Sequence, residues 1–396
     1  MTALTATLRE QAEGFIRPSS TSENAACPAR PIMQAAVVEL LGQRKAAKEA
    51  DLGNRAHAWG ESGIRLLVQD TETCEPLDQI SDIESALAEL RDEHQKEEPS
   101  RRVDPWTWRV VESYVRFVHG LILKYGIEPA NVLVEEVLDV AELGYGNGGR
   151  SDCLLVIPYD LVVVVDLKAG FVEQEEAADH DQASGYACAA AQRFKAKRVE
   201  VWIAQPRQER DRRFSGATFD ADALRDTAAW IQAVNRRCRA PDAELIPAYH
   251  QCHTCRALTL CPAAQEYIVN ASDALALLGK PSTPDTLGAL ADAAKLAEKF
   301  AENGKELVKA ELIAGGAATG WKLGAPRAIS SVVDVPAALA ELEAAGVTAV
   351  QLAGYDAISI KVNKLPDEIE AAIASRITES LSSPPLTADR STKRVA

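Results

Sequence analysis

The sequence predicts an α/β protein. Three segments rich in β-branched and other apolar residues, 132–140, 150–168 and 198–206, have the composition of strands. Residues 106–125 carry apolar side chains at helical spacing before the first strand, and an alanine-rich helix is expected around residues 182–194. A hydrophobic content of 47% over 396 residues suffices for a sizeable core and makes two domains the natural expectation.

The composition excludes several classes of protein. The formal net charge is −15, so any contact with DNA must come from a local patch or through a metal ion. The apolar runs are too short to span a bilayer, and the N-terminus has no apolar secretory core, so we expect a soluble cytoplasmic protein. Eight cysteines in such a chain indicate metal ligands or reduced thiols rather than disulfides.

The N-terminal part contains one helix with a distinctive polar face. Residues 18–28 are rich in proline and serine and predict a loop, and residues 32–50 predict a helix. Gly53, His57 and Glu61 then recur every four residues, which places them on one face of a helix. A lone histidine on a helix is more often structural than a ligand, so its role depends on what lies nearby.

The segment 150–168 predicts a hairpin that brings two acids together. If its tight turn is centred on Tyr159, Asp152 lies directly opposite Asp166, with Cβ atoms about 4.5–5.5 Å apart. Two carboxylates held that close raise each other's pKa unless a cation lies between them. Lys168 falls on the same face as Asp166. A divalent-metal site explains this group better than an exposed hairpin with solvated charges, because the run Val162–Val165 predicts burial on both faces.

Two neighbouring elements carry further polar residues toward this hairpin. The preceding strand, 132–140, contains Glu135 and Glu136, and either could project toward the site. On the following helix, Gln182 and Tyr186 are four residues apart and share one face. Alone, that pair indicates only a helix with a polar side.

Basic residues gather around the fourth predicted strand of this otherwise acidic chain. The set comprises Lys195, Lys197, Arg198, Arg207, Arg210, Arg212 and Arg213. It could follow the phosphates of DNA or simply form a solvated surface, and the sequence favours neither.

Three cysteines form a second motif, C-x-x-C-x(5)-C, at Cys252, Cys255 and Cys261. Three thiolates within ten residues predict a metal site rather than three buried thiols. The fourth ligand could be His253, which would make a zinc knuckle, or the distant Cys27.

The last third of the chain predicts an accessory region. We expect a first domain over residues 1–268 and a mostly helical α+β region over 269–381, with helices near 283–315 and 336–346. Residues 382–396, with two prolines and a basic end, predict a disordered tail. The sequence shows no catalytic constellation in this region.

Taken in order, the motifs G-x-x-x-H, D-x(13)-D-x-K and Q-x-x-x-Y resemble those of the PD-(D/E)XK nuclease superfamily, in its RecB-like branch. The resemblance implies a restriction-endonuclease-like core, with a mixed central sheet flanked by helices. In that family Asp152 and Asp166 would bind Mg²⁺ or Mn²⁺, with His57 as a further ligand and the backbone carbonyl of Leu167 assisting.

The same resemblance implies roles for three more residues. Lys168 would orient or deprotonate the attacking water, or neutralise charge on the phosphorus centre. Gln182 would contact the scissile region or Lys168, and Tyr186 would contact the DNA backbone.

The cysteine pattern is similar to the iron–sulfur staple of AddB-type and CRISPR-adaptation nucleases. That similarity implies a 4Fe-4S cluster held by Cys27, Cys252, Cys255 and Cys261, with Zn²⁺ as the alternative occupant. Binding of the cluster would then be coupled to folding.

Over nearly its full length the chain resembles an uncharacterised family of phage and prophage proteins with a RecB-like nuclease core. The resemblance implies a metal-dependent DNA nuclease, most simply an exonuclease, acting in recombination, replication or repair in the cytoplasm of a bacterial host. DNA would be the substrate, and a phage helicase, annealing protein or single-strand-binding protein would be a partner. The alternative is a non-catalytic DNA-binding or scaffold protein that retains the nuclease fold.

Overall fold

A computed structural model describes most of the chain. It covers residues 6–41, 48–70, 73–98, 101–208, 212–276, 284–324, 328–332, 335–347, 377–381 and 386–388. The chain divides into two compact units, residues 1–297 and 298–396. The boundary expected after residue 268 falls inside helix α10 (Pro262–Ala276), so the first unit is longer than the predicted domain.

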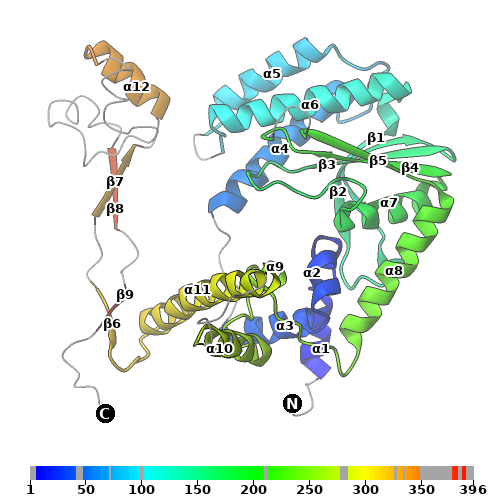
Figure 1. Ribbon diagram of the computed structural model, residues 1–396. Coiled ribbons are helices and arrows are strands. Elements are labelled where there is room, and N and C mark those ends of the chain that lie inside the picture. Colours follow the sequence, from blue (N-terminus) through cyan, green and yellow to red (C-terminus); the bar gives the residue numbers. More distant parts are fainter. Residues whose placement is uncertain are drawn as a thin grey trace. The chain divides into compact units, whose positions relative to one another are not determined.

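The first unit contains a five-stranded mixed sheet in the order β1-β2-β3-β4-β5 (Figure 1). Its strands are β1 (Val132–Leu138), β2 (Gly149–Ile157), β3 (Leu161–Leu167), β4 (Arg198–Ala204) and β5 (Phe214–Phe219). Neighbouring strands are antiparallel except β3 and β4, which are parallel. The predicted order of three strands, a helix and a fourth strand is confirmed. The fifth strand was not predicted.

The β2–β3 hairpin has the predicted register. Cys153 lies opposite Val165 and Ile157 opposite Leu161, so the pairing is symmetric about Tyr159. Tyr159 has a φ of 65°, in the left-handed region, which allows the chain to reverse here. Continuing the register by one residue places Asp152 opposite Asp166.

Helices cover both faces of the sheet (Figure 1). The helices α4 (Lys48–Val68), α5 (Ile83–Lys96) and α6 (Pro105–Tyr125) pack on one face, and α7 (Asp181–Phe194) and α8 (Ala221–Arg239) pack on the other. Val163 and Val165 point into the first core, whereas Val162 and Val164 point into the second. All of β3 is buried, as the unbroken apolar run predicts.

Local sequence signals explain where the main helices begin and end. Asp104 caps α6 by accepting the backbone N–H groups of Trp106 and Thr107, and the helix ends at Gly126, which has a φ of 61°. The His180 side chain caps α7 by accepting the N–H of Ala183. Short 3₁₀ turns at Pro129–Asn131 and Ala141–Leu143 flank β1.

The N-terminal segment is more helical than predicted. Besides α1 (Ala6–Glu13) and α3 (Arg30–Leu41), it contains a 3₁₀ turn, η1 (Pro18–Ser20), and α2 (Thr21–Ala26), so the loop expected at 18–28 was wrong. The segment is ordered by buried polar contacts: Thr21 Oγ1 donates to the carbonyl of Pro18 and lies 2.8 Å from the hydroxyl of Tyr145. The contact between Thr21 and Tyr145, 124 positions apart, cannot be predicted from the local sequence.

The second unit contains helices and two small antiparallel pairings. Its elements, together with the helix that leads into it, are α11 (Pro284–Ile313), β6 (Trp321–Leu323), β7 (Ala328–Val332), α12 (Val335–Ala344), β8 (Ile377–Leu381) and β9 (Leu386–Ala388). Strand β6 pairs with β9, and β7 pairs with β8. The tail was predicted to be disordered from residue 382, but Leu386–Ala388 forms a strand because it finds a partner in β6. The rest of the predicted tail, 382–385 and 389–396, lies outside the described residues.

No helix in the described part of the chain combines the length and apolar character that crossing a membrane requires.

Candidate functional site

Three acidic residues occupy neighbouring positions on the first three strands of the sheet. Glu135 occupies the position opposite Asp152, between the pairs Val134–Cys153 and Glu136–Ser151. The register of β2 and β3 sets Asp152 opposite Asp166. We call Glu135, Asp152 and Asp166 the row; its neighbouring backbone positions are about 4.8 Å apart, the spacing of adjacent strands. The row lies at the end of the sheet where β3 finishes, because Asp166 is the last residue but one of that strand.

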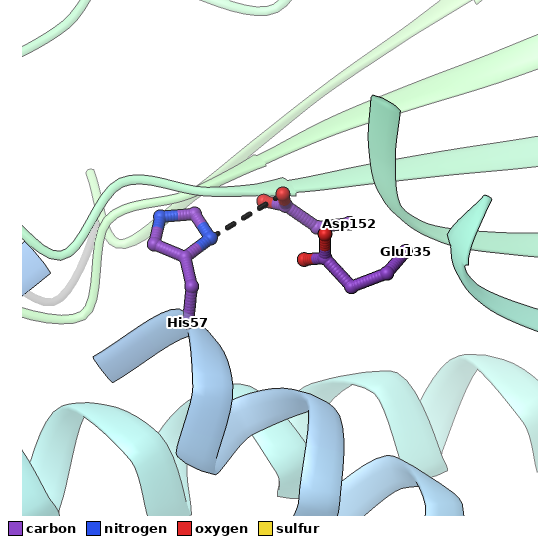
Figure 2. Close-up of side chains that lie close together, drawn as sticks. All are labelled: His57, Glu135 and Asp152. Atoms are coloured by element: carbon purple, nitrogen blue, oxygen red, sulfur yellow. Dashed lines mark ion pairs between the residues drawn. The ribbon is translucent and has the colours of Figure 1, made fainter. Parts of the chain in front are cut away.

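Asp152 is the central residue of this row. Its Oδ1 lies 3.3 Å from Nδ1 of His57, which α4 presents from the face of the sheet it covers (Figure 2). Its Oδ2 accepts the backbone N–H of Leu167 at 2.6 Å. One carboxylate therefore connects the helix α4, the strand β2 and the end of β3.

His57, Glu135 and Asp152 form a group that could hold a cation. Each offers one nitrogen or oxygen atom, and these atoms lie within 4.8 Å of one another. Asp166, predicted as a ligand together with His57 and Asp152, is not in this group, which instead contains Glu135. Figure 2 shows the carboxylate of Glu135 close to that of Asp152, with the imidazole on the other side. Glu135 has a φ of 53°, a conformation that costs a residue other than glycine about 1–3 kcal/mol.

The structure decides which glutamate of β1 belongs to the site. Glu135 joins the group, whereas Glu136 forms an ion pair with Arg193 on α7. Glu61, which shares a face of α4 with His57, pairs with Arg65 one turn later at 2.8 Å and is not part of the group. The sequence alone could not choose between Glu135 and Glu136, because the positive φ of Glu135 breaks the alternation of the strand.

The electrostatics of the group favour positive charge. Burial opposes protonation of His57, but the hydrogen bond to Asp152 and the charges of Asp152 and Asp166 outweigh it, so the pKa of His57 is raised. The pKa of Glu135 is also raised, first by burial and then by the charge of Asp152. A divalent cation bound here would neutralise the charge of the carboxylates, so that neither His57 nor Glu135 would need to take up a proton to do so.

The remaining predicted residues form a chain of contacts beside Asp166. The Asp166 side chain is almost fully buried, and its Oδ2 forms an ion pair at 2.8 Å with Lys168 Nζ, without the angles of a hydrogen bond. Lys168 Nζ donates to Gln182 Oε1 at 2.9 Å, and Gln182 Nε2 donates to the Tyr186 hydroxyl at 3.3 Å. Burial raises the pKa of Tyr186 to about 12, so it stays a neutral phenol.

The predicted basic cluster is not a single patch. Lys195 caps the end of α7, Lys197 and Arg198 lie at the start of β4, and the backbone N–H of Lys197 donates to the carbonyl of Asp160 in the hairpin turn. They are at the opposite end of the sheet from Asp166, about 20 Å away for strands of this length. Arg207 follows the other end of β4 and donates to the backbone carbonyl of Ala169, the residue after Lys168. Arg210 lies outside the described residues.

The four predicted cysteines meet at one small cavity. Cys27, after α2, lines it together with Cys252 at the end of α9 (Tyr249–Cys252), Cys255 and Cys261. Arg30 Nη2 donates to Thr254 Oγ1 at 3.1 Å and helps hold the two distant segments together. His253, the alternative fourth ligand, does not line the cavity.

The two groups suit different metals. Carboxylate oxygens and an imidazole fit Mg²⁺ or Mn²⁺, and thiols fit zinc or an iron–sulfur cluster. Burial raises the pKa of Cys27, Cys255 and Cys252, in the last case to about 11, so without a metal these thiols stay protonated.

The shape of the thiol site bears on its occupant. The cavity is about 20 Å³, which a single ion fits without rearrangement. The sulfur atoms are spread more widely than zinc requires: among the described residues no three thiols lie within 4.8 Å of one another, whereas a tetrahedral zinc site sets them about 3.8 Å apart.

Comparison with known proteins gives a family but no activity. Residues 15–392 match the sequence model of a family described as "Protein of unknown function (DUF2800)". The expected likeness to an uncharacterised family over nearly the full chain is thus confirmed. No curated protein matches the chain.

The raised pKa of His57 gives a testable pH dependence. In metal-free protein we expect His57 to titrate above its ordinary value of 6.5, and Asp152→Asn to lower its pKa, because burial still opposes protonation while the charge of Asp152 and the hydrogen bond to its carboxylate are lost. The histidine ring signals in NMR spectra report this directly. His94 and His119, whose pKa values burial lowers, serve as internal controls.

The same shift links His57 to stability. Since its pKa is raised by folding, its contribution to stability is complete below its ordinary pKa and is lost as the pH rises through the raised pKa. His57→Gln should therefore lower the free energy of unfolding more at acidic than at alkaline pH. Equal losses at both would contradict the ion pair.

Proposed function

The chain belongs to the DUF2800 family, and we propose that it is a metal-dependent DNA nuclease, most simply an exonuclease. The observation that carries the proposal is the row of Glu135, Asp152 and Asp166 with His57 on one side and Lys168 on the other. The resemblance to RecB-like PD-(D/E)XK nucleases implies His57, Asp152, Asp166 and Lys168, and Glu135 is an addition from the structure. The strand order, with α7 connecting the parallel strands β3 and β4, supports the same proposal.

The site separates a cation position from a fixed ammonium group. When bound, Mg²⁺ or Mn²⁺ supplies Lewis-acid stabilisation of charge on phosphorus and promotes ionisation of the attacking water. His57, Glu135 and Asp152 would hold it, with Asp166 opposite Asp152. Lys168 is fixed between Asp166 and Gln182, so its ammonium group orients the water or meets negative charge on the phosphoryl oxygens.

A chain of hydrogen bonds fixes the position of that lysine. Tyr186 orients Gln182, and Gln182 accepts from Lys168, so the ammonium group loses little freedom on binding substrate. In this proposal Gln182 and Tyr186 act mainly on Lys168. Contact of Tyr186 with the DNA backbone, which the resemblance implies, is less favoured because the side chain is buried.

We further propose that the four cysteines hold a 4Fe-4S cluster, with zinc as the alternative. The wide spacing of the sulfur atoms favours the cluster, and the small cavity favours a single ion. A role in phage or prophage recombination, replication or repair, with a helicase, annealing or single-strand-binding partner, follows from the resemblance alone.

The nuclease activity is tested with end-labelled single- and double-stranded DNA in Mg²⁺ or Mn²⁺, using anaerobically purified protein. Lys168→Ala should lower the cleavage rate by about 10²–10⁴-fold, because it removes the group that orients water or neutralises charge. Lys197→Ala, an exposed lysine at the far end of the sheet, should have no effect. Equal activity of wild type and Lys168→Ala would refute the catalytic assignment. Inactive but folded wild-type protein would favour the DNA-binding or scaffold role.

Cation binding is tested separately by calorimetry with Mn²⁺. Asp152→Asn should abolish binding, and Glu135→Gln should weaken it, because each removes charge from the ligand group. Glu136→Gln is the matched control on the same strand, since that glutamate pairs with Arg193 instead. Lys168→Ala should keep most of the affinity. Equal effects of the two glutamate variants would exclude Glu135 from the site.

The occupant of the thiol site is tested by absorbance and metal analysis of anaerobic protein. A cluster gives a brown protein with broad absorbance near roughly 400 nm, whereas zinc is colourless because the ion is d¹⁰. Cys252→Ala should remove the metal and destabilise the first unit. The exposed Cys74→Ala should change neither. Stoichiometric zinc without iron would show that the four cysteines hold zinc and not a 4Fe-4S cluster.

A further inference from the structure

Two exposed aromatic rings lie beside the end of β3. Phe171 is 77% exposed and follows Lys168 by three positions, with Val172, 76% exposed, directly after it. Trp106 is 69% exposed at the start of α6. Large apolar side chains so open to water, grouped at one place, indicate a binding surface.

An arginine covers each ring. Arg207 Cζ lies 4.3 Å from the centroid of Phe171, and Arg109 Cζ lies 4.9 Å from that of Trp106. Stacking of a guanidinium on an aromatic face makes a flat surface that is both apolar and cationic.

Arg207 joins the two rings into one surface. Its Nε donates to the carbonyl of Ala169 at 2.7 Å, and its Nη2 donates to Thr107 Oγ1 at 2.6 Å. Ala169 is the residue after Lys168, and Thr107 is the residue after Trp106. We define the aromatic patch as Trp106, Arg109, Phe171, Val172 and Arg207.

The aromatic patch is within reach of the proposed site of cleavage. Three residues of extended chain span at most about 11 Å, so the Cα atom of Phe171 is no further than that from the Cα atom of Lys168. Stacked nucleotides rise about 3.4 Å each, so Phe171 can meet a base within about three nucleotides of the phosphate at Lys168.

We propose that the aromatic patch stacks on unpaired bases of the DNA strand that enters the acidic site, so that the substrate is single-stranded DNA or an unpaired end. The proposal rests on the proposed nuclease function. Bases in a duplex are stacked on one another, whereas the faces of unpaired bases are free to stack on aromatic and guanidinium groups.

The surrounding charge favours stacking over phosphate binding. Glu173, Glu175 and Glu176 follow the patch directly in the sequence, and Arg212 is paired with Glu173. With a net charge of −15, the protein gains little from counterion release. The dependence of affinity on salt should therefore be shallow, corresponding to about two phosphates, with a slope near −1.4 for a single strand.

The test measures binding of the full chain to a fluorescein-labelled single strand of about 20 nucleotides, and to the same sequence as a duplex, by anisotropy in EDTA. Phe171→Ala and Trp106→Ala should each raise Kd for the single strand by about tenfold or more, with a much smaller change for the duplex. Phe171→Trp should restore affinity, because it restores the ring. Trp230→Ala, a half-exposed aromatic on α8, should bind like wild type.

Failure of this inference is distinguishable from failure of the proposed function. If wild type cleaves DNA but the two alanine variants bind single strands unchanged, the stacking role is overturned and the nuclease stands. If wild type does not cleave DNA but binds single strands through Phe171, the stacking role stands and the nuclease falls. Unchanged DNA binding together with a dimer of wild type that Phe171→Ala dissociates, seen by light scattering, would assign the patch to self-association.

Discussion

The register of the β2–β3 hairpin determines the geometry of the whole site. Strand β3 is apolar on both faces, so its valines pack equally well after a slip of one residue and cannot select the register by themselves. Two local features select it: the reversal at Tyr159, and the bond from the Leu167 N–H to the side chain of Asp152. Once the register is fixed, Glu135, Asp152 and Asp166 occupy neighbouring positions on the three strands.

The same alignment brings like charges onto adjacent strands, which lowers the stability of the fold. Carboxylates on adjacent strands destabilise one another when no opposite charge is near. His57, which pairs with the central Asp152, and Lys168, which pairs with Asp166, offset part of this cost. It also holds Glu135 in a left-handed conformation that places its carboxylate beside Asp152 rather than away from it. A backbone that accepts strain in order to bring like charges together indicates selection for the site rather than for stability.

The sequence predicted those features that depend on local periodicity. The helices α6 and α7, the first four strands and the opposition of Asp152 and Asp166 followed from the local sequence pattern. It did not predict β5, because Phe214–Phe219 contains a glycine and small residues and is a strand only through its pairing with β4.

Long-range contacts account for the other errors. The helical turns at Pro18–Ala26 include Thr21, which contacts the distant Tyr145. The choice of Glu135 over Glu136 depends on the positive φ angle of Glu135, which cannot be predicted from the residue type. The basic residues are close in sequence but separate in space, because β4 runs the length of the sheet between Arg198 and Arg207. The four cysteines were grouped correctly because thiols at metal-ligand spacing are a stronger signal than charge.

The thiol cavity sets the order in which the first unit can be completed. It joins Cys27 to a segment that is synthesised more than 200 residues later, as the contact between Arg30 and Thr254 spans 224 positions. The sheet and both helical layers are synthesised between its two halves, so during translation the N-terminal segment must wait for nearly the whole unit to emerge. A nascent chain interrupted before Cys261 would hold all three acids of the row and still lack one of the four thiols that line the cavity, so closure of the cavity requires synthesis through Cys261.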